Sequence, residues 1–162
     1  MKKAKVVISS RTSKLSRPLI LTTKATPQSR MVSLPKINQR GRNLRLELFS
    51  DINFEGNRIV FNDGEVAVRD LRLFNYNDVL SSFRFRNSGE RRNVSLVLFE
   101  DINYQGNFKV YRGSRNIANL VNEGFNDRAS SFVFVARRIS NSRIRRIQDE
   151  RRPPGAVLEI RS

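Results

Sequence analysis

The sequence contains no cysteine and no histidine among its 162 residues. Without cysteine there is no disulfide bond, no thiol catalysis and no zinc–thiolate site. Without histidine the chain lacks the commonest general base and the commonest metal ligand. Any metal ion must therefore be held by oxygen atoms, which favours Ca²⁺ or Mg²⁺ over zinc or copper.

The sequence also lacks a long apolar run. Its first residues are basic, and the apolar stretches at 6–8 and 19–21 are much shorter than the core of a secretory signal peptide. No stretch approaches the length of a membrane span. We therefore expect a protein without a signal peptide or a membrane span, either cytoplasmic or part of a cell, spore or particle coat assembled from inside.

No group of side chains indicates catalysis. With neither histidine nor cysteine, a catalytic triad would need an unusual lysine or carboxylate arrangement, and no such arrangement is visible. The acidic residues Glu47, Glu65 and Asp70 have the spacing of ordinary strand and loop charges. We expect a protein that is not an enzyme.

The positive charge is concentrated at the two ends of the chain. Residues 1–43 hold eleven Lys and Arg and no acid, residues 44–135 hold twelve of each sign, and residues 136–162 hold eight Arg and three acids. This partition predicts a neutral domain over 44–135, a basic, Pro/Ser/Thr-rich arm over 1–43 and an Arg-rich arm over 136–162. Extended basic arms on a neutral domain favour contact with a polyanion or an acidic partner, although arms that only keep the protein soluble are the alternative. The arm residues expected to make these contacts are Lys2, Lys3, Lys5, Arg11, Lys14, Arg17, Arg143, Arg145, Arg146, Arg151 and Arg152.

Short elements are expected within the arms. Lys5–Ile8 and Leu19–Thr22 have the composition of strands that add to a sheet edge in an assembly. Arg143–Ile147 is predicted to form one or two helical turns that Pro153 and Pro154 stop. Ala156–Ile160 is predicted to be a last strand.

The middle of the chain repeats itself. The segment LELFSDINFEGNRIVF (46–61) aligns with LVLFEDINYQGNFKVY (96–111) at an offset of 50, and NDVLSSFRF (77–85) aligns with NDRASSFVF (126–134) at an offset of 49. Apolar residues alternate with polar ones in both copies, which predicts half-buried antiparallel strands. Two motifs, 44–87 and 93–135, with about four strands each predict an all-β, eight-stranded sandwich of two sheets. A short helix is expected at Asn116–Val121.

Each motif contains a tight hairpin with a structural role. Two aromatic residues flank the turn, and a glycine follows the second one at a position where a positive φ is expected. The aromatic rings then pack across the folded hairpin. These hairpin residues are Phe49, Phe54 and Gly56 in the first motif and Phe99, Tyr104 and Gly106 in the second.

Each motif also contains an oxygen-rich hexapeptide just before a strand, Asn77–Ser82 and Asn126–Ser131. A hard cation needs six to eight oxygen ligands, so one hexapeptide would need a second loop or solvent to complete its shell. The alternative is that Asn-Asp makes a turn and the serines cap it. The spacing alone favours turn chemistry.

The doubled pattern, aromatic-x4-aromatic-x-Gly followed by N/D-N/D-x-x-S/T-S, resembles the βγ-crystallin family in its microbial, calcium-binding form. The resemblance covers about 92 of the 162 residues. It implies two Greek-key motifs that exchange strands between two four-stranded sheets. It also implies two Ca²⁺ sites at one end of the sandwich.

The resemblance also assigns ligand roles. It gives the fifth-position hydroxyls of Ser81 and Ser130 to calcium, whereas Ser82 and Ser131 are expected to hydrogen-bond the folded hairpins. The other ligands that it implies are Asn77, Asp78, Val79 and Glu100 for the first loop, and Asn126, Asp127, Arg128 and Ser50 for the second. With one carboxylate in each loop, we expect modest affinity, in the range of about 10⁻⁶–10⁻³ M.

Three functions remain open at this stage. The first is a calcium-binding structural or stress protein whose basic arms mediate self-assembly or attachment to an anionic partner. The second is a subunit of a coat, shell or fibre in which the domain is only a scaffold. The third is a nucleic-acid-binding or anionic-polymer-binding protein, although no known nucleic-acid motif accompanies the charge.

Overall fold

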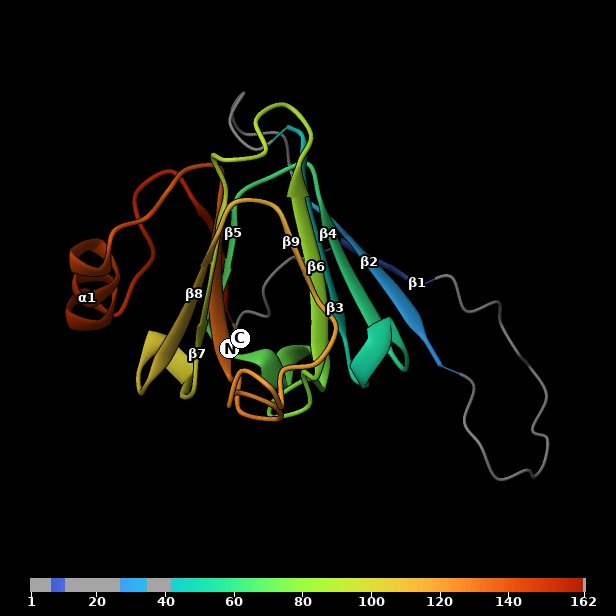
Figure 1. Cartoon of the computed structure of the whole chain (residues 1–162). Helices are drawn as coiled ribbons and strands as arrows, with labels where there is room; N and C mark the ends of the chain where they lie inside the picture. Colours follow the sequence, from blue (N-terminus) through green and yellow to red (C-terminus); the bar gives the residue numbers. More distant parts are fainter. Residues whose placement is uncertain (1–6, 11–26, 35–41, 162) are drawn as a thin grey trace, which may run out of the picture.

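The alternating apolar residues of the two motifs form two β-sheets that pack face to face (Figure 1). The structure, a computed structural model, describes residues 7–10, 27–34 and 42–161. The first sheet has the strand order β1-β2-β4-β3-β6-β9, with β1 at Val7–Ser10, β2 at Ser29–Ser33, β4 at Arg58–Asn62, β3 at Leu44–Phe49, β6 at Ser82–Asn87 and β9 at Arg115–Ile117. The second has the order β11-β5-β10-β7-β8, with β11 at Leu158–Ile160, β5 at Val66–Val68, β10 at Ser131–Val135, β7 at Ser95–Phe99 and β8 at Phe108–Arg112.

The two motifs are Greek keys that exchange one strand. In the first motif β3 pairs with β4 and β6, whereas β5 pairs with β10 of the second motif. In the second motif β7 pairs with β8 and β10, whereas β9 pairs with β6 of the first. The predicted all-β sandwich of eight strands in two sheets is thus confirmed, and β1, β2 and β11 extend it.

Aromatic rings bridge the two sheets in the core. Phe61 lies edge-on to Phe132, with ring centroids 5.4 Å apart, and Phe85 lies edge-on to Phe134 at 5.8 Å. All four side chains are buried. Each stabilises the fold by roughly 1.5–3 kcal/mol through burial, and aromatic packing adds to that.

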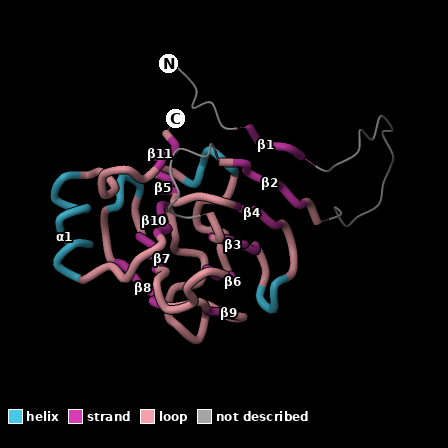
Figure 2. The backbone as a smooth tube through the Cα atoms, turned by 90° about the horizontal axis from the view of Figure 1, so that it is seen from above, coloured by secondary structure: helices cyan, strands magenta, loops and turns pink. Residues whose placement is uncertain are grey.

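The segment after the second motif folds onto the body rather than forming an extended arm. Ser140 caps the N-terminus of helix α1 (Asn141–Glu150), and its side chain accepts a hydrogen bond from Arg143 N. The helix lies over the outer face of the second sheet (Figure 2) and buries Ile144 and Ile147 there. This corrects the expected extended C-terminal arm, because these isoleucines form an apolar stripe that must be buried. The expected helix and last strand are both present.

The N-terminal strands lie at the opposite edge of the sandwich. β2 runs parallel to β4, and β1 runs antiparallel to β2. The expected strand at Lys5–Ile8 overlaps β1, and the expected strand at Leu19–Thr22 lies outside the described residues. Within the described parts of the chain, no helix is long and apolar enough to cross a membrane.

The connection expected to be helical at Asn116–Val121 has a different structure. Its first residues belong to β9, and turns follow at 120–124. The prediction was wrong because β9 hydrogen-bonds to the edge of β6 in the other motif, a long-range pairing that overrides local helix propensity.

Candidate functional site

Each hairpin brings its two aromatic rings together. The Phe49 and Phe54 rings lie 5.7 Å apart edge-to-face, and Phe99 and Tyr104 repeat this geometry at 5.7 Å. Gly56 follows at φ +78, where an added Cβ would lie 2.6 Å from Asp51 Cγ. Only glycine therefore fits this position without a shift of the turn.

The sixth serine of each hexapeptide holds its own motif's hairpin. Ser82 accepts a hydrogen bond from Phe54 N at 3.0 Å and donates one to the Asp51 carbonyl at 2.5 Å. Ser131 accepts from Tyr104 N at 3.1 Å and donates to the Asp101 carbonyl at 2.6 Å. Both serines are fully buried, so their polar contacts are structural.

The fifth serine of each hexapeptide instead reaches the other motif. Ser130 Oγ donates to Asp78 Oδ1 at 3.2 Å. Ser81 Oγ lies 3.2 Å from Asp127 Oδ1 and 3.3 Å from the Val79 carbonyl. We name the two groups the Asp78–Ser130 cluster and the Asp127–Ser81 cluster. The sequence interpretation placed each serine beside the carboxylate of its own loop, whereas these hydrogen bonds pair them across the motifs.

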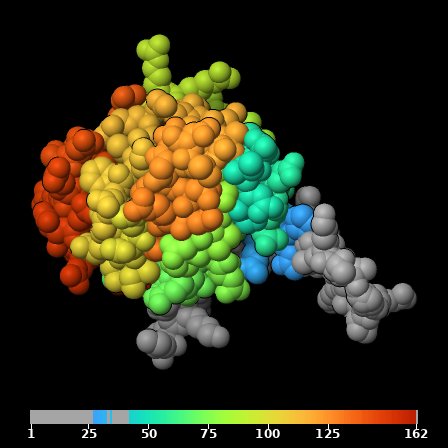
Figure 3. All heavy atoms as spheres, turned by 60° about the horizontal axis from the view of Figure 1, so that its bottom comes forward, coloured from blue at the N-terminus to red at the C-terminus, as the bar shows by residue number. Residues whose placement is uncertain are grey.

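Backbone hydrogen bonds produce this crossing. Asp78 N donates to the Ala129 carbonyl and Asp127 N to the Leu80 carbonyl, both at 3.1 Å. The connecting segments cross in the same way, because Leu71 N donates to Ser130 O and Leu120 N to Ser81 O. The two hexapeptides therefore form one continuous end of the sandwich, at which the segments near 70–80 and 120–130 lie side by side (Figure 3).

The short helix η2 (Leu71–Phe74) supports this end. Asp70 caps it by accepting a hydrogen bond from Arg72 N at 3.0 Å. The hydrogen bond from the Arg72 side chain holds the pKa of Asp70 below its usual value, against a smaller opposing effect of burial. Asp70 therefore stays ionised as the cap of the helix that holds Ser130 O.

The backbone of each loop takes a left-handed turn at its carboxylate. Asp78 has φ 53 and Asp127 has φ 52. The preceding asparagine amide donates to this carboxylate, from Asn77 Nδ2 at 2.7 Å and from Asn126 Nδ2 at 2.8 Å. These contacts satisfy the turn chemistry that the spacing alone favoured.

One buried oxygen in this region has no partner. Asn126 Oδ1 is inaccessible to solvent and accepts no hydrogen bond within the described part of the chain. A buried polar atom without a partner costs roughly 1–3 kcal/mol. The same side chain contacts the Asp127 carboxylate through its Nδ2, and carboxylate and amide oxygens are both ligands that hard cations bind.

The charged side chains near the second loop also affect how well it could bind a cation. Arg128, whose carbonyl is an expected ligand, directs its guanidinium to the Glu100 carboxylate in an ion pair. The pairing offsets part of the positive charge beside the second loop. The described residues contain no group of three or more carboxylates, so any cation here would depend mainly on neutral oxygens.

The basic residues expected to contact a partner divide into two groups. The six from Lys2 to Arg17 lie outside the described residues. Those from Arg143 to Arg152 lie on or just after α1, where Arg146 and Arg152 both pair with Glu150. Their role toward a partner stays a prediction.

The chain is similar to several proteins of known structure. No protein-family model and no curated protein matches the sequence. Among solved structures, one from work on the evolution of the eye-lens βγ-crystallin fold is 26% identical, with a TM-score of 0.49 and coverage of 61% of this chain and 89% of that one. A βγ-crystallin from Ciona intestinalis is 24% identical, with a TM-score of 0.43 and coverage of 54% and 95%. A βγ-crystallin domain from Clostridium beijerinckii is 19% identical, with a TM-score of 0.43 and coverage of 56% and 97%. These similar structures are βγ-crystallin domains, the family that the doubled motif of this chain resembles.

Proposed function

We propose that this chain is a calcium-binding structural protein in which the Asp78–Ser130 cluster and the Asp127–Ser81 cluster each hold one Ca²⁺ ion. The observation that carries the proposal is the buried, unpartnered Asn126 Oδ1 beside Asp127. Turn chemistry uses the amide nitrogen of Asn126 and leaves this oxygen without a partner. A cation ligated by the oxygen would remove the cost of its burial.

The donor set fits calcium better than a softer metal. Every available ligand is a carboxylate, amide, hydroxyl or carbonyl oxygen, since the sequence has no His or Cys. In the crossed arrangement we assign to the first cluster the side chains of Asn77, Asp78 and Ser130 and the carbonyls of Arg128 and Glu100. We assign to the second the side chains of Asn126, Asp127 and Ser81 and the carbonyls of Ser50 and Val79, the latter 3.3 Å from Ser81 Oγ.

The crossed pairing gives a bound ion a structural effect. Each cluster joins a carboxylate of one motif to a hydroxyl of the other. Calcium bound there would link the two Greek keys and stabilise the folded chain by mass action. At a free concentration of 100 times the Kd this stabilisation is about 2.7 kcal/mol per site.

The second part of the proposal concerns the basic segments 1–43 and 136–162. They attach the domain to an acidic partner or to neighbouring copies of the chain. The charge partition supports this, because residues 1–43 carry eleven basic residues and no acid. Light scattering of the whole chain at low and high salt, with and without heparin, tests it. We expect salt-sensitive complexes, and an unchanged monomer under all conditions would contradict attachment.

Thermal unfolding of the whole chain tests the calcium proposal. The melting midpoint is compared in millimolar Ca²⁺ and in EDTA, for the native sequence and for Asp78→Gly with Asp127→Gly. Glycine tolerates the left-handed turn and removes only the carboxylate. The matched control is Asp63→Gly, since Asp63 is an exposed aspartate at φ 61 outside the clusters. We expect calcium to raise the midpoint of the native chain and of the control, and to leave that of the double variant unchanged.

A further inference from the structure

The two outer faces of the sandwich differ in a way that the internal repeat makes directly comparable. On the second sheet the outer face is apolar, and Ile139, Ile144 and Ile147 cover it. The corresponding positions on the first sheet are polar, and no helix within the described ranges covers them. The pairs related by the repeat offsets are Arg45 with Ser95, Glu47 with Val97, Arg84 with Val133, and Arg86 with Val135.

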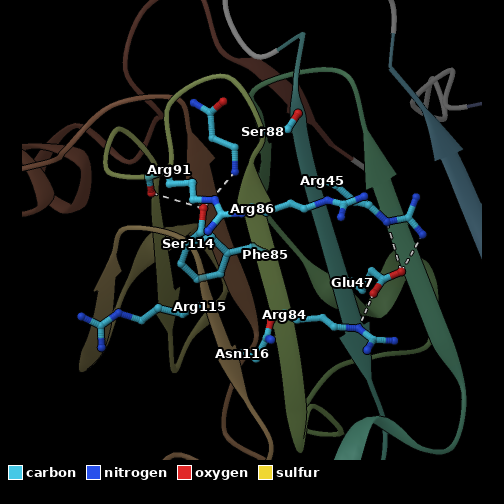
Figure 4. Close-up of a pocket in the computed structure, with 11 residues that line it drawn as sticks. Arg45, Glu47, Arg84, Phe85, Arg86, Ser88, Arg91, Ser114, Arg115 and Asn116 are labelled. Carbon is cyan, nitrogen blue, oxygen red and sulfur yellow. Dashed lines mark hydrogen bonds and ion pairs between the residues drawn. The ribbon is translucent and has the colours of Figure 1, made fainter.

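Arginines line a groove on this open face (Figure 4). The groove has a volume of about 770 Å³ and lies across β3, β6 and β9. Its charged lining consists of Arg45, Arg84, Arg86, Arg91 and Arg115, with Glu47 as the one carboxylate.

Glu47 is already shared by several guanidinium groups. It lies 2.6 Å from Arg45 Nη2 and 3.6 Å from Arg58 Nη1, and it also accepts a hydrogen bond from Arg84 Nε. Arg84 is held further by the rings of Phe49 and Phe54, whose centroids lie 5.1 and 5.0 Å from its Cζ. Two arginines of the groove are therefore fixed in place before any ligand arrives, which lowers the entropic cost of binding.

None of the other three arginines pairs with an Asp or Glu carboxylate, and Arg115 Nε donates to the Arg112 carbonyl at 3.3 Å. All fifteen Asp and Glu residues of the sequence fall within the described ranges, and none forms an ion pair with Arg86, Arg91 or Arg115. Arg86 also lies directly opposite Arg45 across the strand pair. Like charges at directly opposite positions destabilise a sheet. An anion bound between them would reverse this effect.

The lining indicates what kind of anion fits. Phe85 is its one apolar side chain and is only 2% exposed, so the groove offers no apolar anchor of the kind protein partners use. It likewise offers no exposed aromatic ring on which a nucleic-acid base could stack. Guanidinium groups bind phosphate oxygens in pairs, and the volume is within the range of small-molecule sites.

We propose that this groove binds a small, multiply charged phosphate compound, that is, an oligophosphate. Arg86 and Arg91 supply the guanidinium groups that neutralise it, and Glu47 holds Arg45 and Arg84 in position beside it. This site is separate from the two clusters at the end of the sandwich and does not depend on calcium.

Isothermal titration calorimetry of the whole chain with sodium tripolyphosphate, in calcium-free buffer, tests the proposal. The groove variant is Arg86→Gln with Arg91→Gln, because both side chains are exposed. The matched control is Arg138→Gln with Arg161→Gln, which removes the same charge from exposed positions that are assigned to no binding site. We expect the groove variant to lose at least about tenfold in affinity, since hydrogen bonds to charged groups are strong, and the control to lose less than about twofold.

Three further ligands, namely orthophosphate, citrate and a single-stranded oligonucleotide, distinguish specific oligophosphate binding from non-specific attraction between opposite charges. Orthophosphate and citrate are expected to bind at least about tenfold more weakly than tripolyphosphate. Equal losses in the groove and control variants would overturn the proposal, because binding would then follow net charge. Binding of a single-stranded oligonucleotide that depends on Arg86 and Arg91, without tripolyphosphate binding, would also overturn it. Circular dichroism of the variants shows whether they fold.

Discussion

Ser130 of the second motif donates a hydrogen bond to Asp78 of the first at 3.2 Å. Ser81 and Asp127 form the reciprocal contact at the same distance. The two oxygen clusters are therefore shared between motifs that lie about 50 residues apart in the sequence. A single Greek key contains only half of each cluster.

Pairs of substitutions distinguish shared clusters from separate loops. Ser81→Ala with Asp127→Gly alters one shared cluster, and we expect one calcium ion still to bind per chain. Ser81→Ala with Asp78→Gly alters both clusters, and we expect both ions to bind weakly or not at all. Calorimetric stoichiometry measures the difference. If the second pair retains one intact site and the first pair loses both, each loop binds calcium on its own.

The sixth serines should affect stability without affecting calcium. Ser131→Ala leaves Tyr104 N and the Asp101 carbonyl without their hydrogen bonds, and we expect a loss of about 1–3 kcal/mol in the free energy of unfolding. Urea denaturation measures it, with Ser88→Ala as an exposed control. A loss of calcium stoichiometry without a loss of stability would contradict this role.

The C-terminal helix should behave as part of the fold. Ile144 is fully buried against the second sheet, and Ile144→Ala should lower the free energy of unfolding by about 2–4 kcal/mol. Arg145→Ala on the exposed side of the same helix should change it by less than about 0.5 kcal/mol. Equal, negligible effects of both substitutions would mean that the helix does not pack on the sheet.

Stability should also depend on pH through Glu47. Burial raises the pKa of this carboxyl, but hydrogen bonds from Arg45 and Arg84 outweigh burial, so its pKa lies below the ordinary value. A lowered pKa gives stability that is present above the unfolded-state pKa of about 4.3 and lost as pH falls through the folded-state pKa. Glu47→Gln should therefore destabilise the chain at pH 7 and approach the native stability in acid.

Denaturant unfolding between pH 7 and pH 3 measures this convergence. The control is Glu123→Gln, whose carboxylate is more exposed and lies 3.9 Å from its one lysine partner. If the difference in the free energy of unfolding between the native chain and Glu47→Gln stayed constant over this pH range, it would contradict a lowered pKa of Glu47.

Much of the fold follows from the sequence. The period-2 alternation and the internal repeat predicted the eight strands of the two motifs. The hairpin glycines were recognisable because the spacing of aromatic residues around them occurs twice. Helix α1 was also predictable in outline from Arg143–Ile147, but its packing was not. Net charge drew attention to its arginines, whereas Ile144 and Ile147 decide where it lies.

The crossed clusters were not predictable in the same way. The sequence shows which residues carry oxygen atoms, but a serine and a carboxylate in one hexapeptide look like natural partners. Their separation depends on long-range hydrogen bonds, such as that from Asp78 N to the Ala129 carbonyl. The arginine groove was hidden for a related reason. Residues 44–135 have no net charge as a whole, and only the sheet register gathers arginines on one face.

Calorimetric titration of the whole chain with Ca²⁺ tests the central claim most directly. The shared clusters predict two ions bound per chain, with dissociation constants in the range of about 10⁻⁶–10⁻³ M, and loss of both sites in Asp78→Gly with Asp127→Gly. The absence of binding heat, together with a melting midpoint that is the same in calcium and in EDTA, would contradict the claim.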